Sequence, residues 1–189
     1  MQSRINHRGS RCQCREIDNR QAAGFTKHMS EKTLLVVWHS RTGASEAMAK
    51  AVAKGAGEAA LLLKAEDVRR EDFESAGAYC FVCPENLASI SGMMKEMFDR
   101  LYYPLLGSIE GRAYATIIAA GSDGEGAQRQ IDRIATGWRL RRVMDEMIVN
   151  FDAQTPAEIL AMKTVPQSII DDCQDLGSGM AEGLRLGIF

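Results

Sequence analysis

The residues best suited to chemistry form a short polar segment directly after an apolar run. The segment reads His39, Ser40, Arg41, Thr42, Gly43, Ala44 and Ser45. It offers three hydroxyl groups, a glycine that lets a ligand approach the backbone, and the first amides of an expected helix. Such donors converge on an anion, and the helix dipole favours negative charge, so the segment predicts a phosphate site. The alternative is an ordinary capping loop, because Ser and Thr are common at helix starts.

Two further polar segments follow other apolar runs. They comprise Pro84, Glu85, Asn86, Leu87, Ala88 and Ser89, and then Gly121, Ser122, Asp123, Gly124, Glu125 and Gly126. The commoner nucleotide fingerprints are missing, since there is no G-x-x-x-x-G-K-[ST] and no G-x-G-x-x-G after the first apolar run. Their absence disfavours ATP and the usual NAD-binding fold.

The elements that must position these segments alternate between strands and helices. The run from Thr33 to Trp38 is typical of a strand buried on both faces, and residues 44–56 have one apolar helical face. The rest of the chain predicts strands at 59–64, 77–83, 113–120 and 143–149, helices at 91–101 and 126–139, and a C-terminal helix begun by a capping box at 155–158. This alternation predicts an α/β fold, a three-layer doubly wound five-stranded parallel sheet. Such sheets bind ligands at the carboxyl ends of their strands, where all three polar segments fall.

Residues 33–189 resemble the flavodoxin-like family, nearest to its NAD(P)H-dependent FMN reductases and quinone oxidoreductases. The residues at 40, 42, 43 and 45 match the S/T-x-T-G-x-S/T loop with which that family holds the 5′-phosphate of FMN. The stretch 84–95 is similar to the family's loop around the isoalloxazine ring, and 121–126 stands where the family closes over the ring's other side. The resemblance implies FMN as the cofactor, with residues 40–45 on the phosphate and 84–89 and 121–126 around the ring.

This chain departs from the family pattern in two ways: the first concerns the contacts of the ring, and the second separates an enzyme from an electron carrier. Leu87 and Ala88 stand where family members often have an aromatic residue and a glycine, and residues 84–92 and 121–126 contain no Trp or Tyr. Carrier flavodoxins sandwich the flavin between aromatic rings and are strongly acidic, whereas this chain has a pI near 6.0. We therefore expect an oxidoreductase that passes a hydride from NAD(P)H through FMN to a quinone or similar acceptor. The alternatives are a non-catalytic flavodoxin-type carrier for a partner enzyme, or a domain that no longer binds flavin.

Other reactive residues have simpler interpretations. Cys80 and Cys83 fall on opposite faces of one strand and are interpreted as core residues. His39 is the single histidine after residue 29, and both Ser-His-Asp and Cys-His catalysis require a histidine. The sequence therefore gives little support to either kind of catalysis, and we assign no catalytic residue. No metal site is predicted. Three arginines near the last strand could meet an NADPH phosphate or could simply be solvated: Arg139, Arg141 and Arg142.

Composition bounds the domain organisation. The chain has 189 residues, 46% apolar and 25% charged, which suits one globular domain. Residues 1–29 carry six Lys or Arg against two Asp or Glu, and we expect a disordered basic tail before a domain at 30–189. Met29, directly before that domain, is a second candidate start of translation, which N-terminal sequencing of the native protein tests.

The same composition excludes several classes of protein. Residues 30–189 have a net charge of −6, which disfavours nucleic-acid binding. Apolar runs such as Leu34–Trp38 are five residues long, far below the roughly 20 of a membrane span. The five cysteines do not have the even number and spacing of a disulfide framework, which favours a reducing, cytoplasmic location. An apolar helix face at 93–98 is typical of a core or a subunit interface, which leaves a homodimer or homotetramer open.

Overall fold

The computed structural model describes residues 33–189. The expected tail over residues 1–29 and the candidate start at Met29 lie outside the described residues. The elements follow one another as β1 (Thr33–Trp38), α1 (Ala44–Ala56), η1 (Gly57–Ala59), β2 (Ala60–Lys64), α2 (Arg70–Ser75), β3 (Ala76–Asn86), β4 (Ser89–Ile90), α3 (Gly92–Leu105), β5 (Ala113–Ala120), α4 (Glu125–Gly137), β6 (Arg141–Arg142), β7 (Met147–Asn150), α5 (Pro156–Leu160) and α6 (Gln167–Leu186). The predicted bounds of α1 and β5 agree with the structure.

The strands form a sheet in the order β2-β1-β3-β5, and both β6 and β7 pair with the outer side of β5. β6 pairs with the beginning of β5 and β7 with its end, so together they occupy the place of a fifth strand. The strand predicted at 143–149 is wrong over residues 143–146, which join β6 to β7 without strand structure. These pairings are all parallel, whereas the short β4 folds back antiparallel onto β3. The predicted α/β class with a doubly wound parallel sheet is confirmed.

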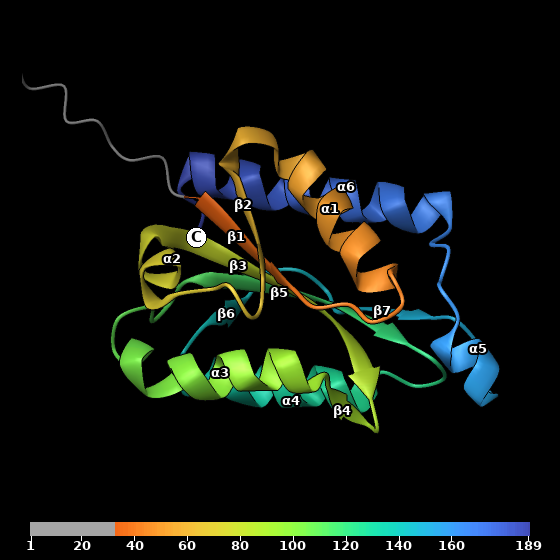
Figure 1. Cartoon of the computed structure of the whole chain (residues 1–189). Coiled ribbons are helices and arrows are strands. Elements are labelled where there is room, and N and C mark those ends of the chain that lie inside the picture. Colours follow the sequence, from red (N-terminus) through yellow and green to blue (C-terminus); the bar gives the residue numbers. More distant parts are fainter. Residues whose placement is uncertain (1–32) are drawn as a thin grey trace, which may run out of the picture. The chain divides into compact units, whose positions relative to one another are not determined.

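Helices cover both faces of this sheet. Figure 1 shows α1 and α6 against one face and α3 and α4 against the other. Successive strand residues serve opposite faces: Val36 belongs to the core under α1 and α6, and Val37 to the core under α3 and α4. Cys80 and Cys83 divide between the two cores in the same way, and both are fully buried. Their interpretation as core residues is confirmed.

The segment after β7 differs from the prediction. Thr155 and Glu158 form the expected capping box, with Glu158 N–H donating to Thr155 Oγ1 at 3.3 Å and Thr155 N–H donating to Glu158 Oε2 at 2.9 Å. The helix that follows, α5, ends at Leu160, and the long C-terminal helix α6 begins only at Gln167. A capping box fixes where a helix starts, but α5 buries none of its residues and so has no packing to extend it. The prediction that this box opens the C-terminal helix is wrong.

Three short elements, η1, α2 and β4, were not predicted, because three, six and two residues are too few to show a clear period. Within residues 33–189, no helix is both long enough and apolar enough to cross a bilayer. Since parallel strands end at the same edge of a sheet, the loops that follow β1, β3, β5 and β7 share one edge, and the candidate site lies there.

Candidate functional site

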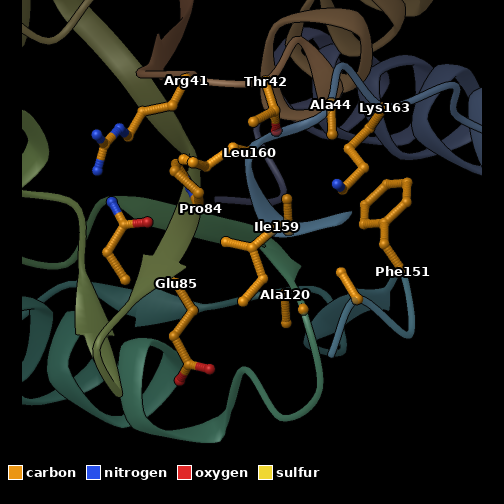
Figure 2. Close-up of a pocket in the computed structure, with 14 residues that line it drawn as sticks. Arg41, Thr42, Ala44, Pro84, Glu85, Ala120, Phe151, Ile159, Leu160 and Lys163 are labelled. Carbon is orange, nitrogen blue, oxygen red and sulfur yellow. The ribbon is translucent and has the colours of Figure 1, made fainter. Parts of the chain in front are cut away.

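A pocket of about 210 Å³ opens at the carboxyl ends of β1, β3, β5 and β7. Its lining comes from the loop between β1 and α1, the end of β3, the end of β5, and residues 151–163 after β7. Figure 2 shows side chains from these segments converging on it. Seven residues of the predicted site line the pocket: Arg41, Thr42, Ala44, Pro84, Glu85, Asn86 and Gly121.

The loop between β1 and α1 presents unused hydrogen-bond donors. Gly43 has a left-handed backbone, with φ of 85°, and its N–H donates to Ser40 Oγ at 3.0 Å. The first bond of α1 runs from Ala47 N–H to Gly43 O, and no side chain caps the three amides between them. The hydroxyl of Ser45 is the one buried side-chain oxygen or nitrogen in residues 33–189 that lacks a hydrogen-bond partner. Buried polar groups are nearly always paired, so these donors indicate a site for an acceptor.

The start of α4 resembles the start of α1, but its amides are already bound to an anionic side chain, the carboxylate of Glu85. Gly124 also has a left-handed backbone, with φ of 95°. The carboxylate of Glu85 accepts hydrogen bonds from Gly124 N–H at 2.8 Å and from Ala127 N–H at 3.2 Å. No side chain plays this part at α1 among the described residues. The amides of α1 are therefore left for an external anion.

The predicted ring-binding segment 84–89 forms a tight hairpin between β3 and β4. Leu87 and Ala88, at its turn, have positive φ of 54° and 57°. Ser89 Oγ donates to Gln130 Oε1 on α4 at 2.6 Å, and a Cβ on Gly126 would lie 2.3 Å from Ala88 O. The hairpin therefore rests against the start of α4, and its residues Pro84, Glu85 and Asn86 form one wall of the pocket. Leu87 is fully exposed at the turn, and neither Leu87 nor Ser89 lines the pocket.

The predicted segment 121–126 reaches the pocket only through Gly121. Ser122 O accepts a hydrogen bond from Asn150 Nδ2 at 2.9 Å. Asp123 Oδ1 accepts one from Glu125 N–H at 3.3 Å. The two later glycines of this segment lie at the start of α4, where Gly126 is against the hairpin and Gly124 is against Ile148 and Ala120. The segment thus supports the wall that the hairpin presents to the pocket.

Residues 151–163, here called the strap, cover the pocket on the side opposite the hairpin wall and were not predicted as part of the site. Backbone hydrogen bonds tie down both ends, from Phe151 N–H to Ala120 O at 2.9 Å and from Lys163 N–H to Thr42 O at 2.8 Å. Five strap residues line the pocket with an aromatic ring, three aliphatic groups and a cation: Phe151, Ala153, Ile159, Leu160 and Lys163. No sequence pattern indicated them, because the contacts join segments far apart along the chain.

Known proteins share this arrangement of sheet, helices and loops. The chain is 27% identical over 162 residues to a flavodoxin from Aquifex aeolicus (strain VF5), a match that covers 81% of this chain and 87% of that protein. A flavodoxin from the domain Archaea superposes with a TM-score of 0.67 at 18% identity, over 81% of this chain and 99% of that one. The chain has a flavodoxin-like fold.

Other flavodoxin-like structures have chains of different sizes. The flavodoxin, WrbA-like protein from Agrobacterium tumefaciens superposes with a TM-score of 0.63 at 16% identity, over 82% of this chain and 98% of that one. The flavodiiron protein from Giardia intestinalis has a TM-score of 0.65 at 18% identity over 82% of this chain, but only 36% of that one is covered. No family model matches the chain. The predicted resemblance to the flavodoxin-like family is confirmed.

His39 lies at the end of β1 in this flavodoxin-like chain but does not line the pocket. Its Nδ1 is hydrogen-bonded to Ser91 Oγ at 2.9 Å. Burial lowers the pKa of His39 from its ordinary value of 6.5, with the nearby Arg41 acting in the same direction and Glu66 opposing it. His39 is therefore neutral at pH 7 and joins β1 to the start of α3. Among residues 33–189, no three His, Cys, Asp or Glu side chains cluster as a metal site requires.

The arginines near the last strand lie away from the pocket. Arg141 and Arg142 form β6, which pairs with the beginning of β5, whereas the pocket lies at its end. Arg142 forms an ion pair with Asp132, and Arg139 forms one with Glu110 at 3.3 Å. These arginines therefore do not reach a ligand in the pocket of this flavodoxin-like chain.

Proposed function

We propose that this chain binds FMN with the phosphate at the start of α1. The observation that carries the proposal is the buried, unpartnered hydroxyl of Ser45 beside the uncapped amides of the same turn. A phosphate monoester carries about 1.5–2 negative charges and three strong acceptor oxygens, so it can satisfy these donors together. The hydroxyl groups of Ser40 and Thr42 lie on the same loop. The similarity to flavodoxins supports a flavin as the molecule that carries this phosphate.

The pocket favours a mononucleotide over FAD. The phosphate loop leads directly into α1 and offers one group of free amides. The volume of about 210 Å³ lies below the roughly 300–1,000 Å³ of ordinary ligand pockets. The side formed by α5 is exposed and buries no residue, whereas the hairpin wall is fixed to α4. The middle of the strap, α5, is therefore the part that would move outward when FMN enters, while the two bonded ends of the strap stay in place.

The shape of the pocket suits a flat ring next to the hairpin wall. Pro84 and Asn86 line the wall side, and Ile159 and Leu160 line the strap side. Figure 2 shows the two aliphatic side chains turned into the pocket. Aliphatic groups pack well against an aromatic ring, so these residues would orient the isoalloxazine ring in the pocket.

The proposed reaction is hydride transfer from NAD(P)H and delivery of the reducing equivalents to a quinone. FMN, when bound, supplies this chemistry, and the protein binds, orients and shields it. In balance, NAD(P)H, a proton and a quinone give NAD(P)⁺ and a hydroquinone, so no other reductant or oxidant is needed. Phe151 is the single aromatic residue among those that line the described pocket, which supports an exposed flavin face for one flat substrate at a time. Cys80 and Cys83 take no part, because both are fully buried.

A second candidate function is that of an electron carrier for a partner enzyme. The similarity to the Aquifex aeolicus flavodoxin favours it. The strap also exposes three apolar side chains near the pocket, which suits contact with a protein: Ile159, Leu160 and Met162. The two functions differ in what reduces the flavin, because a carrier requires a partner reductase and an oxidoreductase of the proposed kind requires only NAD(P)H.

Anaerobic mixing of the FMN-loaded protein with NADH or NADPH distinguishes these functions. We expect either nucleotide to bleach the flavin absorbance, and a benzoquinone to restore it. Free FMN at the same concentration and protein stripped of flavin are the controls. If neither nucleotide at millimolar concentration bleaches the flavin while a flavodoxin reductase does, the chain is a carrier. If the protein takes up no FMN at all, the proposed cofactor is wrong.

A further inference from the structure

We propose that Lys163 binds the phosphate of the flavin and thereby makes the site selective for FMN over riboflavin. This inference rests on the proposed binding of FMN. It assigns a role to a residue that lies far from the phosphate loop in the sequence and is brought to it by the strap.

The first argument is position. Lys163 N–H donates to Thr42 O at 2.8 Å, so the backbone of the strap is bonded to the phosphate loop itself. Next to it, Met162 Cε lies 2.9 Å from where a Cβ on Gly43 would be. Lys163 lines the same pocket as Thr42 and Ala44, and Figure 2 shows its Nζ turned into that pocket. The ammonium group is therefore carried on a segment in direct contact with the loop that offers the phosphate donors.

The second argument is the hydrogen bonding of the ammonium group. Lys163 Nζ donates to Ala161 O at 3.1 Å and to Glu158 O, both within the strap. An ammonium group has three protons, so one remains for an acceptor in the pocket. The two carbonyl groups hold Nζ in place without neutralising it. Binding of a phosphate then requires only a small change in this side chain.

The third argument is the charge balance. Three other lysines of the described chain form ion pairs with carboxylates: Lys50 with Glu46, Lys64 with Glu66, and Lys95 with Asp99. Lys163 has no carboxylate ion pair among residues 33–189, and it is half-buried. The donors at the start of α1 are neutral amides and hydroxyl groups, whereas a phosphate is an anion. A cation beside them supplies a charge-assisted hydrogen bond, which is the stronger kind.

The test compares two ligands that differ only in the phosphate. Wild type, Lys163→Met, Lys163→Arg and Lys54→Met are titrated with FMN and with riboflavin, and binding is followed by quenching of flavin fluorescence. Lys54 is the matched control, because it is an exposed lysine of α1 that does not line the pocket. We expect Lys163→Met to weaken FMN binding about tenfold, at the low end for a hydrogen bond to a charged group because the side chain is half-buried. Riboflavin binding stays unchanged in that variant, and Lys163→Arg keeps most of the preference for FMN.

Two results would overturn this inference. In the first, Lys163→Met binds FMN as tightly as wild type. In the second, the variant loses FMN and riboflavin affinity by the same factor, which would mean that Lys163 only supports the shape of the strap. A wild-type protein that binds neither flavin would instead refute the proposed function, and the inference with it.

Discussion

Replacing Ser45 by Ala should change two properties in opposite directions. The hydroxyl is buried without a partner, and an unpaired buried hydroxyl costs about 1–3 kcal/mol of stability in proteins. The apoprotein of Ser45→Ala should therefore be more stable than wild type by up to this amount, with a few tenths of a kcal/mol added by the helix propensity of Ala. In the proposed FMN complex the same hydroxyl would donate to the phosphate, and its loss should cost about 1.5–3 kcal/mol of binding free energy. That loss corresponds to an increase in Kd of about tenfold to 100-fold.

The control for this variant is Ser91→Ala. Ser91 is as buried as Ser45, but its hydroxyl is hydrogen-bonded to His39 Nδ1 at 2.9 Å. We expect this variant to destabilise the apoprotein by about 1 kcal/mol and to leave FMN affinity nearly unchanged. Urea denaturation gives the stability of each apoprotein, and fluorescence titration with FMN gives the Kd of each variant. A Ser45→Ala apoprotein that is less stable than wild type and binds FMN equally well would refute the reasoning.

Three further predictions concern two residues beside the site and the buried cysteines of the core. Glu85→Ala removes the carboxylate that caps α4, and urea denaturation should show a loss of about 1 kcal/mol of stability, whereas an unchanged midpoint would contradict the capping role. Because burial lowers the pKa of His39 below 6.5, the fold disfavours its protonated form. The stability that His39 contributes is complete above pH 6.5 and is lost as the pH falls toward the lowered pKa. In His39→Asn, stability measured by urea denaturation should fall less between pH 6.5 and lower pH than it does in wild type. The same dependence of stability on pH in both proteins would contradict this role of His39. Burial raises the pKa of the Cys83 thiol to about 12, so mass mapping after alkylation should find Cys80 and Cys83 unlabelled in the native protein and labelled after denaturation.

The sequence predicts regular elements well where many residues share one period. The helix Ala44–Ala56 and the strand Ala113–Ala120 agree with prediction because each has a long, consistent apolar pattern. The segment after β7 was harder to predict, since a capping box marks a start and carries no information on length. The length of α5 depends on packing that a local pattern does not contain.

The candidate site was predictable in part for the same reason. The phosphate loop is local, and its hydroxyls, glycine and helix start stand next to one another in the sequence. The role of Glu85 as a cap of α4 and the arrival of Phe151 and Lys163 at the pocket depend on contacts between distant segments. No local pattern marks the strap, because its place beside the pocket depends on contacts that the sequence around it does not contain.

The central claim is that the start of α1 holds the phosphate of FMN. The most direct test is to incubate the purified protein with a mixture of FMN and FAD, remove unbound flavin, release the bound flavin by denaturation and identify it by chromatography. The account predicts FMN at about one equivalent per chain, with little FAD. Recovery of FAD as the main flavin, or of no flavin at all, would contradict it.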